Sequence, residues 1–147
     1  MTDAATQAFI ASFREAGVTG IPCDEWEITQ LQQDLGVELP PAYKAFLAVA
    51  GNGFAPLEGS HYALEDDLSE LQKDGQRIAA HEKSTLPAGA FVFLVHQGFA
   101  CLFLVLHDMD DPAVFECVEG GGPPRPVSLR FSDWVREQLA NPRALKG

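Results

Sequence analysis

Phe91-Val-Phe-Leu-Val95, His96-Gln97-Gly98 and Phe99-Ala-Cys-Leu-Phe-Leu-Val-Leu106 follow one another without a gap, and this stretch decides the fold of the 147-residue chain. Two apolar runs that are separated by a turn containing glycine predict two antiparallel strands. The second run is too apolar for a strand with one face in water. We therefore expect residues 99–106 to form the central strand of a sheet, covered on both faces and by helices on at least one of them.

Downstream of this pair, the pattern predicts a turn, a third strand and a closing helix. His107-Asp-Met-Asp-Asp-Pro112 is the turn, and Val114–Val118 is the strand. Gly120-Gly-Gly-Pro-Pro124 is expected to be a plain connector, because no helix N-terminus follows it to bind a phosphate. A short strand at Val127–Leu129 precedes a last helix capped by Ser132, and its inward residues are expected to be Trp134, Val135 and Leu139.

Upstream, three short helices are predicted in the first third of the chain. The first carries an apolar stripe and stops at Gly17; the stripe consists of Ala8, Phe9, Ser12, Phe13 and Ala16. The second begins at Asp24, an expected N-cap with Glu27 three residues later, and ends at Gly36. Its predicted apolar face consists of Trp26, Ile28, Leu31 and Leu35.

The third helix opens at Pro40-Pro41, because proline is favoured in the first turn of a helix. Asn52-Gly53 is expected to end it with a positive-φ residue. Residues 54–89 are acidic and mostly irregular, apart from a short helix from Asp66 to Arg77 with Leu68 and Leu71 inward. The whole pattern predicts an α+β fold in one domain, residues 1–147, with N-terminal helices packed on an antiparallel meander and a C-terminal helix closing it.

The net charge of −11 is unevenly spread along the chain. Residues 1–50 carry an excess of −5 and residues 51–110 an excess of −6, whereas residues 111–147 are neutral. Such a field repels nucleic acids and anionic membranes and speeds association with a basic protein. General acidity, which many soluble proteins share, is the alternative explanation.

The sequence contains none of the common patterns of an active site, such as Gly-x-Ser-x-Gly, a phosphate-binding Gly-Lys loop or His-Glu-x-x-His. Three cysteines, Cys23, Cys101 and Cys117, lack Cys-x-x-Cys spacing and are predicted to be free thiols. We therefore expect no catalytic residues, no cofactor and no metal. No apolar run approaches the ~18 residues of a membrane span, and no secretory signal is visible, so a cytoplasmic protein is expected.

Two acidic segments are the candidate partner-binding surface. One lies in the irregular region and combines aromatic and acidic residues: His61, Tyr62, Glu65, Asp66, Asp67 and Glu70. The other is the turn after the central strand, with Asp108, Asp110 and Asp111. A solvated acidic loop explains the first segment as well as an interface does. The second has three carboxylates for a cation but lacks the glycine and terminal glutamate of a calcium loop.

Several of these residues together resemble the signatures of the SUKH superfamily, the Smi/Knr-like domains named for a fungal cell-wall assembly regulator. The first signature is Ile28-x-x-Leu31-x-x-x-Leu35-Gly36-x-x-Leu39-Pro40-x-x-Tyr43-x-x-Phe46-Leu47, followed by Asn52-Gly53. The second is Phe91-Val-Phe-Leu with His96-Gln97-Gly98 and Asp110-Asp111-Pro112-x-Val114. Phe131-Ser132-x-Trp134-Val135-x-x-x-Leu139 is similar to the final helix.

The resemblance implies the α+β fold expected above and a role in protein binding. Bacterial members commonly look like immunity proteins, which bind and neutralise protein toxins that are often nucleases or other enzymes with basic active sites. A scaffold or regulatory domain without an immunity role, as in the fungal members, is the alternative. Residues 54–89 match no signature of the family. Because variable loops on a shared scaffold often determine specificity, the interface is expected there.

Overall fold

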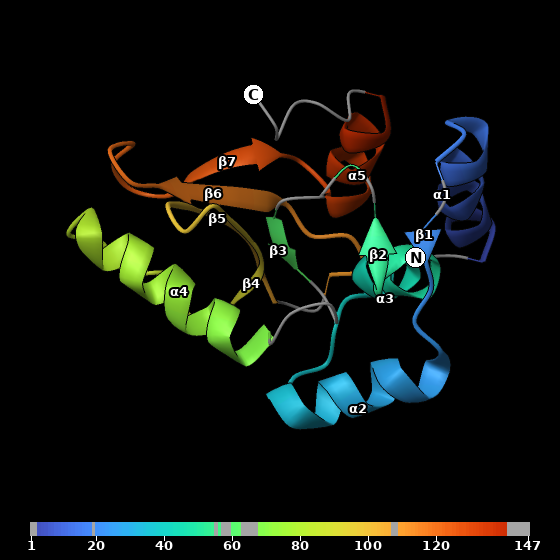
Figure 1. Cartoon of the computed structure of the whole chain (residues 1–147), viewed down its shortest axis with the longest axis horizontal. Helices are drawn as coiled ribbons and strands as arrows, with labels where there is room; N and C mark the ends of the chain where they lie inside the picture. The colour runs from blue at the N-terminus through green and yellow to red at the C-terminus, as the bar shows by residue number, and fades with distance from the viewer. Residues whose placement is uncertain are drawn as a thin grey trace.

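A computed structural model of the chain describes residues 3–18, 20–54, 56, 60–62, 68–106 and 109–140. They form an α+β fold in which helices flank an antiparallel sheet (Figure 1). Among these residues, no helix is long and apolar enough to cross a lipid bilayer.

The main sheet has five strands, and every neighbouring pair is antiparallel. In spatial order they are β3 (Ser60–Tyr62), β4 (Ala90–His96), β5 (Ala100–Val105), β6 (Val114–Val118) and β7 (Arg125–Ser128). The predicted meander is therefore confirmed, with β5 at its centre. Gln97 and Gly98 turn the chain between β4 and β5 with φ angles of 51° and 78°.

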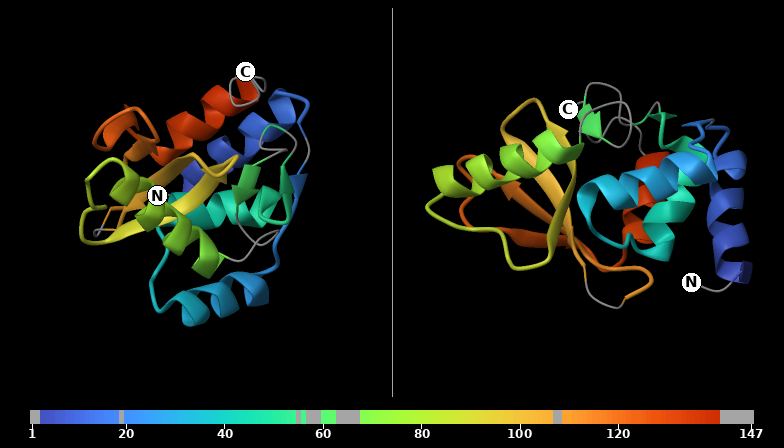
Figure 2. Two further views of the ribbon diagram at one scale, coloured as in Figure 1. Left: turned by 60° about the vertical axis from the view of Figure 1, so that its left-hand side comes forward. Right: turned by 90° about the horizontal axis from the view of Figure 1, so that it is seen from below.

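Helices cover both faces of this sheet (Figure 2). On one face α4 (Leu68–His81) packs across β4, β5 and β6. On the other side, three helices pack against one another: α1 (Asp3–Glu15), α3 (Pro41–Ala50) and α5 (Phe131–Ala140). The remaining helix, α2 (Glu25–Leu35), lies at the periphery and packs on α3. β1 (Gly20–Ile21) and β2 (Gly53–Phe54) form a separate pair beside α3.

An aromatic cluster joins the helical layer to the sheet. Phe131 on α5 is fully buried, and its ring lies 5.4 Å from Tyr43 on α3 and 5.3 Å from Phe93 on β4. The register of β4 against β5 shifts between Val92 and Leu94, so Phe93 is the extra residue of a bulge. This bulge directs the Phe93 ring into the helical layer, where it also contacts Trp134.

Most of the predicted helix signals are confirmed. Asp24 and Glu27 form a complete capping box at the start of α2, and Gly36 ends that helix in the left-handed conformation with φ 67°. Leu68 and Leu71 are buried on α4, as expected, although that helix extends to His81. β3 and the β1–β2 pair were not predicted, because strands of two or three residues are too short to show a period.

The predicted inward position of Trp26 is wrong, since its side chain is 70% exposed. Residues of an α-helix advance by about 100° each, which places Trp26 about 200° from Ile28. Ile28, Leu31 and Leu35 form the inward stripe of α2, so Trp26 points to the opposite side. The sequence already contained this spacing.

The predicted positive-φ stop after α3 is also wrong. Gly51 has φ −63°, and neither Asn52 nor Gly53 has a positive φ. A glycine is instead required at Gly51 for space, because a Cβ there would overlap the Sγ of Cys23 and lie 2.9 Å from the carbonyl oxygen of Leu47. Close packing therefore explains this glycine.

The Gly120–Gly122 turn is more than a connector, because it binds the carboxylate of Glu82. The backbone N–H groups of Gly120 and Gly122 donate to Glu82 at 3.0 and 2.8 Å, and His81 Nδ1 lies 2.8 Å from the same carboxylate. These bonds, led by that of Gly120, lower the pKa of Glu82 from 4.5 to about 2, and the bond to Glu82 raises the pKa of His81. The turn thus ties the β6–β7 hairpin to the end of α4.

We expect the Glu82→Gln variant to have a lower melting temperature than the wild type at neutral pH. A depressed carboxylate pKa contributes stability above the unfolded value of 4.5, and this contribution is lost as the pH falls toward about 2. The raised pKa of His81 contributes below 6.5, and this part is lost as the pH rises through the folded-state value. The difference between the two proteins should therefore be largest between pH 4.5 and 6.5.

Thermal unfolding followed by circular dichroism from pH 2.5 to 8 measures this difference. Glu70→Gln is the matched control, because Glu70 lies on α4, the helix that ends just before Glu82, and its ion pair with Lys73 is exposed. Its melting temperature should follow that of the wild type across the range. A Glu82→Gln difference that stays constant between pH 2.5 and 6 would contradict the assignment.

Candidate protein-binding site

The described candidate residues of the first acidic segment lie on two different elements, β3 and α4. Glu65, Asp66 and Asp67 lie outside the described residues, as does Asp108 of the second segment. The backbone of His61 and Tyr62 belongs to β3, opposite Val95 and Leu94 of β4. Glu70 lies exposed on α4 and pairs with Lys73 at 3.1 Å.

Asp110 and Asp111 lie together in the connection between β5 and β6, where each serves the N-terminus of a helix. Because α3 starts with two prolines, it has no side-chain cap, and the N–H of Ala42 donates to the Asp110 carbonyl at 3.0 Å. The Asp111 carboxylate accepts from the backbone N–H of Ser132 at 2.9 Å and from its hydroxyl. The cap of α5 is therefore Asp111, and the prediction that Ser132 caps this helix is wrong.

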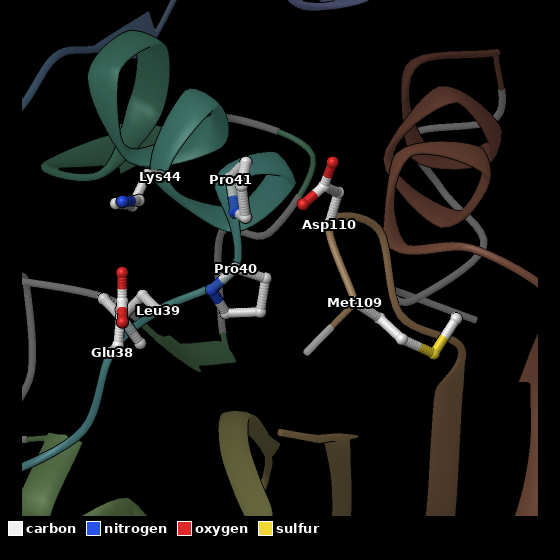
Figure 3. A pocket seen from close by; sticks show the side chains of 7 residues that line it. All are labelled: Glu38, Leu39, Pro40, Pro41, Lys44, Met109 and Asp110. Atoms are coloured by element: carbon white, nitrogen blue, oxygen red, sulfur yellow. The ribbon is translucent and has the colours of Figure 1, made fainter. Parts of the chain in front are cut away.

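Asp110 also borders a hollow of about 270 Å³ between the start of α3 and the β5–β6 connection. Figure 3 shows Glu38 and Lys44 on one side of this hollow and Asp110 and Met109 on the other, with Pro40 and Pro41 between them. Met109 is 53% exposed. The complete lining is Glu38, Leu39, Pro40, Pro41, Lys44, Met109 and Asp110.

A second, more apolar hollow of about 470 Å³ shares Glu38 with the first. It lies between the end of α2, α4 and the first residues of β4. Its lining is Leu35, Val37, Glu38, Gln72, Gln76, Gly89, Ala90, Phe91 and Leu106. We call the two hollows together the Glu38 groove. It combines an apolar floor with charged groups at its rim, as protein-binding sites do.

Local structure explains why Glu38 points into the groove. After Gly36, the N–H of Val37 donates to the Gln32 carbonyl at 3.2 Å, and the N–H of Leu39 donates to the Gln32 side chain at 2.8 Å. These two bonds fix the backbone on both sides of Glu38. Leu39 is buried and Glu38 is exposed.

One wall of the groove depends on Gln72. Its side-chain oxygen accepts from the backbone N–H of Val92 at 2.8 Å, and its side-chain nitrogen donates to the Val92 carbonyl at 2.7 Å. In the part of the chain that the structure describes, β3 pairs with β4 at residues 94–96. The Gln72 side chain therefore replaces a neighbouring strand at Val92 and fixes α4 at this edge of the sheet.

The chemistry available in the groove is recognition of cationic and apolar groups. Among the described lining residues, Glu38 and Asp110 are the acids and Lys44 is the base. Within the described part of the chain, no three His, Cys, Asp or Glu side chains are grouped to hold a metal ion. Burial raises the pKa of the Cys23 and Cys101 thiols to about 12, so both stay protonated at neutral pH.

Asp110 is thus the one predicted site residue that the described structure places in the groove. Glu38 was not singled out in the sequence. Its signal was the alternation of Val37, Glu38 and Leu39 between a helix-ending glycine and a proline pair. Gln72 and Met109 had no comparable signal, because only the fold brings them to the same surface.

Comparison with known proteins identifies one family. The model of the SMI1 / KNR4 family (SUKH-1) matches residues 22–137, which contain the entire lining of the Glu38 groove. A comparison with curated proteins found no match.

Proposed function

Since the chain belongs to the SMI1 / KNR4 family (SUKH-1), we propose that it is an immunity protein that binds and neutralises a cognate bacterial toxin. It acts in the cytoplasm by protein–protein contact and not by catalysis. The toxin has a basic surface, as a nuclease or another enzyme acting on an anionic substrate does. The observation that carries this proposal is the Glu38 groove, a concave surface that combines apolar residues with two acids and one base, in a chain of net charge −11.

Charge supports the choice of partner. The excess of negative charge lies in residues 1–110, which supply all the residues of the groove. A negative field raises the rate of encounter with a basic protein, and this effect decreases with salt. The same field opposes binding of nucleic acids and anionic membranes, so neither is a proposed partner.

Membership of the family supports a second function, a scaffold or regulatory domain that binds a protein of the same cell. Both functions use a binding surface, and they differ in the partner. Protection of a cell against the product of the neighbouring gene distinguishes them, because an immunity gene normally lies beside its toxin gene.

Reversing the two acids of the groove should weaken toxin binding at least tenfold and abolish protection. The variant is Glu38→Lys with Asp110→Lys, and its main expected effect is slower association with a smaller dependence on salt. The fold should be retained, because Glu38 is exposed and the bond of Asp110 to Ala42 runs through its backbone carbonyl. Co-expression with the toxin and association kinetics at low and high salt are the measurements.

Glu137→Lys is the matched single-charge control, because Glu137 lies exposed on α5 and does not line the groove. Paired with a second exposed reversal, Glu15→Lys at the end of α1, it gives the same change in net charge. Asp66→Lys with Asp67→Lys tests the interface expected in residues 54–89. If only that last variant loses protection, the proposed groove is wrong but the proposed function stands. If the wild type itself gives no protection, the immunity function is wrong.

A further inference from the structure

Trp26 is the large aromatic side chain that α2 exposes to solvent. Its exposed fraction is 70%, compared with 4% for Trp134, the other tryptophan of the chain. An exposed indole is unfavourable in water, and tryptophan is strongly enriched among residues that dominate binding energy at interfaces. A face of α2 is therefore available for contact.

This face is a defined stripe of the helix. Residues three and four apart lie side by side on an α-helix, which places Thr29 and Gln33 in line with Trp26. Both are exposed. Over the seven helical steps from Trp26 to Gln33, the stripe extends about 10 Å along the axis.

The stripe continues into the groove. A third hollow, of about 320 Å³, is lined by Thr29, Gln32, Gln33, Gly36, Val37 and Glu38. It shares Val37 and Glu38 with the apolar hollow of the Glu38 groove. A partner that enters the groove beside Glu38 is therefore close to the outward face of α2.

The charge around Trp26 indicates which kind of group would bind to its side chain. Residues 15–43 contain six acids and no lysine or arginine. The side chains of Asp24 and Glu27 bond to backbone N–H groups in the capping box, but Glu25 and Asp34 are exposed on either side of the stripe. An indole in a negative field attracts a cation to its face, and a planar guanidinium stacks there better than an ammonium group.

From this combination we propose that the outward face of α2 binds an arginine of the protein partner, stacked on the Trp26 indole. This inference deepens the proposed function and rests on it only for the identity of the partner. Trp26 serves as an anchor outside the groove, Glu25 and Asp34 supply the negative field, and the Glu38 groove takes the adjoining segment. The partner accordingly presents an arginine close to an apolar side chain.

Titration with hexaarginine and hexalysine peptides at low salt tests the stacking without the toxin. The two indole N–H signals in a proton–nitrogen correlation spectrum report on Trp26 and Trp134, and Trp26→Phe assigns them. Hexaarginine should shift the Trp26 signal and leave that of Trp134 in place, at several-fold lower concentration than hexalysine. An unmoved Trp26 signal, or equal concentrations for the two peptides, would overturn the proposal.

The toxin provides the second arm. Trp26→Ala should weaken its binding at least tenfold, whereas Leu129→Ala, at a residue that is 87% exposed, should leave the affinity unchanged. Unchanged binding by Trp26→Ala, with a wild type that binds, overturns this proposal and leaves the proposed function intact. If the wild type does not bind the toxin but hexaarginine shifts its Trp26 signal, the stacking site is supported and the immunity function is refuted.

Discussion

Replacing Phe131 by alanine is expected to lower the free energy of unfolding by about 3–5 kcal/mol, the cost of removing a fully buried phenylalanine. Its side chain is 0% exposed. Four rings surround it, with centroids 5.3–6.0 Å away, on Tyr43, Phe46, Phe93 and Trp134. These residues come from α3, β4 and α5, so the cavity would open where the sheet meets the helical layer.

Urea unfolding followed by circular dichroism measures this loss. Phe99→Ala is the control, because Phe99 is 40% exposed in the turn between β4 and β5, and its loss should cost less than about 1.5 kcal/mol. A Phe131→Ala variant that loses no more than this control would show that the cluster does not organise the core.

The sheet could be predicted because its strands follow one another in sequence and its centre is almost wholly apolar. A run such as 99–106 has few ways to avoid water other than as an internal strand, and the turn at Gln97-Gly98 fixes the direction of its neighbour. α4 was predicted only in part, although its Leu68 and Leu71 were placed correctly. The part of α4 beyond Arg77 was not predicted, because the length of this helix depends on the sheet face against which it packs.

The helix signals succeeded where they are local and failed where they depend on neighbours. Asp24 and Glu27 satisfy each other within one turn, so the capping box was visible in the sequence. Ser132 has the residue type of a cap, but the carboxylate that bonds to its N–H comes from Asp111, 21 residues earlier. A side chain so distant in sequence can be assigned only when the fold is known.

The candidate site was less predictable than the fold because it is assembled from separate segments. The Glu38 groove takes residues from the α2–α3 linker, α4, β4 and the β5–β6 connection. The sequence showed that the β5–β6 connection is acidic, but it gave no reason to connect that segment with Glu38. Many residues of the family signature serve the scaffold: Leu39, Tyr43, Phe46 and Leu47 are all buried.

Gly51 offers a direct test of this structural role, because packing and backbone conformation predict different outcomes. At φ −63° alanine is allowed, and by shrinking the unfolded ensemble it would stabilise the protein by about 0.4–1 kcal/mol. The structure predicts the opposite sign. A Cβ at Gly51 overlaps Cys23 Sγ, and overpacking of this kind costs about 1–3 kcal/mol.

A double-mutant cycle identifies the cause of the Gly51→Ala loss. Cys23→Ala removes the sulfur atom, so the double variant should be more stable than the sum of the two single losses predicts, by about 0.5–3 kcal/mol. Gly53→Ala is the control, because the added Cβ would approach the flexible end of Ile21, at 2.9 Å, and that exposed side chain can rotate away. Urea unfolding of the four proteins gives the coupling. Strict additivity, or a Gly51→Ala variant more stable than the wild type, would mean that contact with Cys23 is not what requires glycine here.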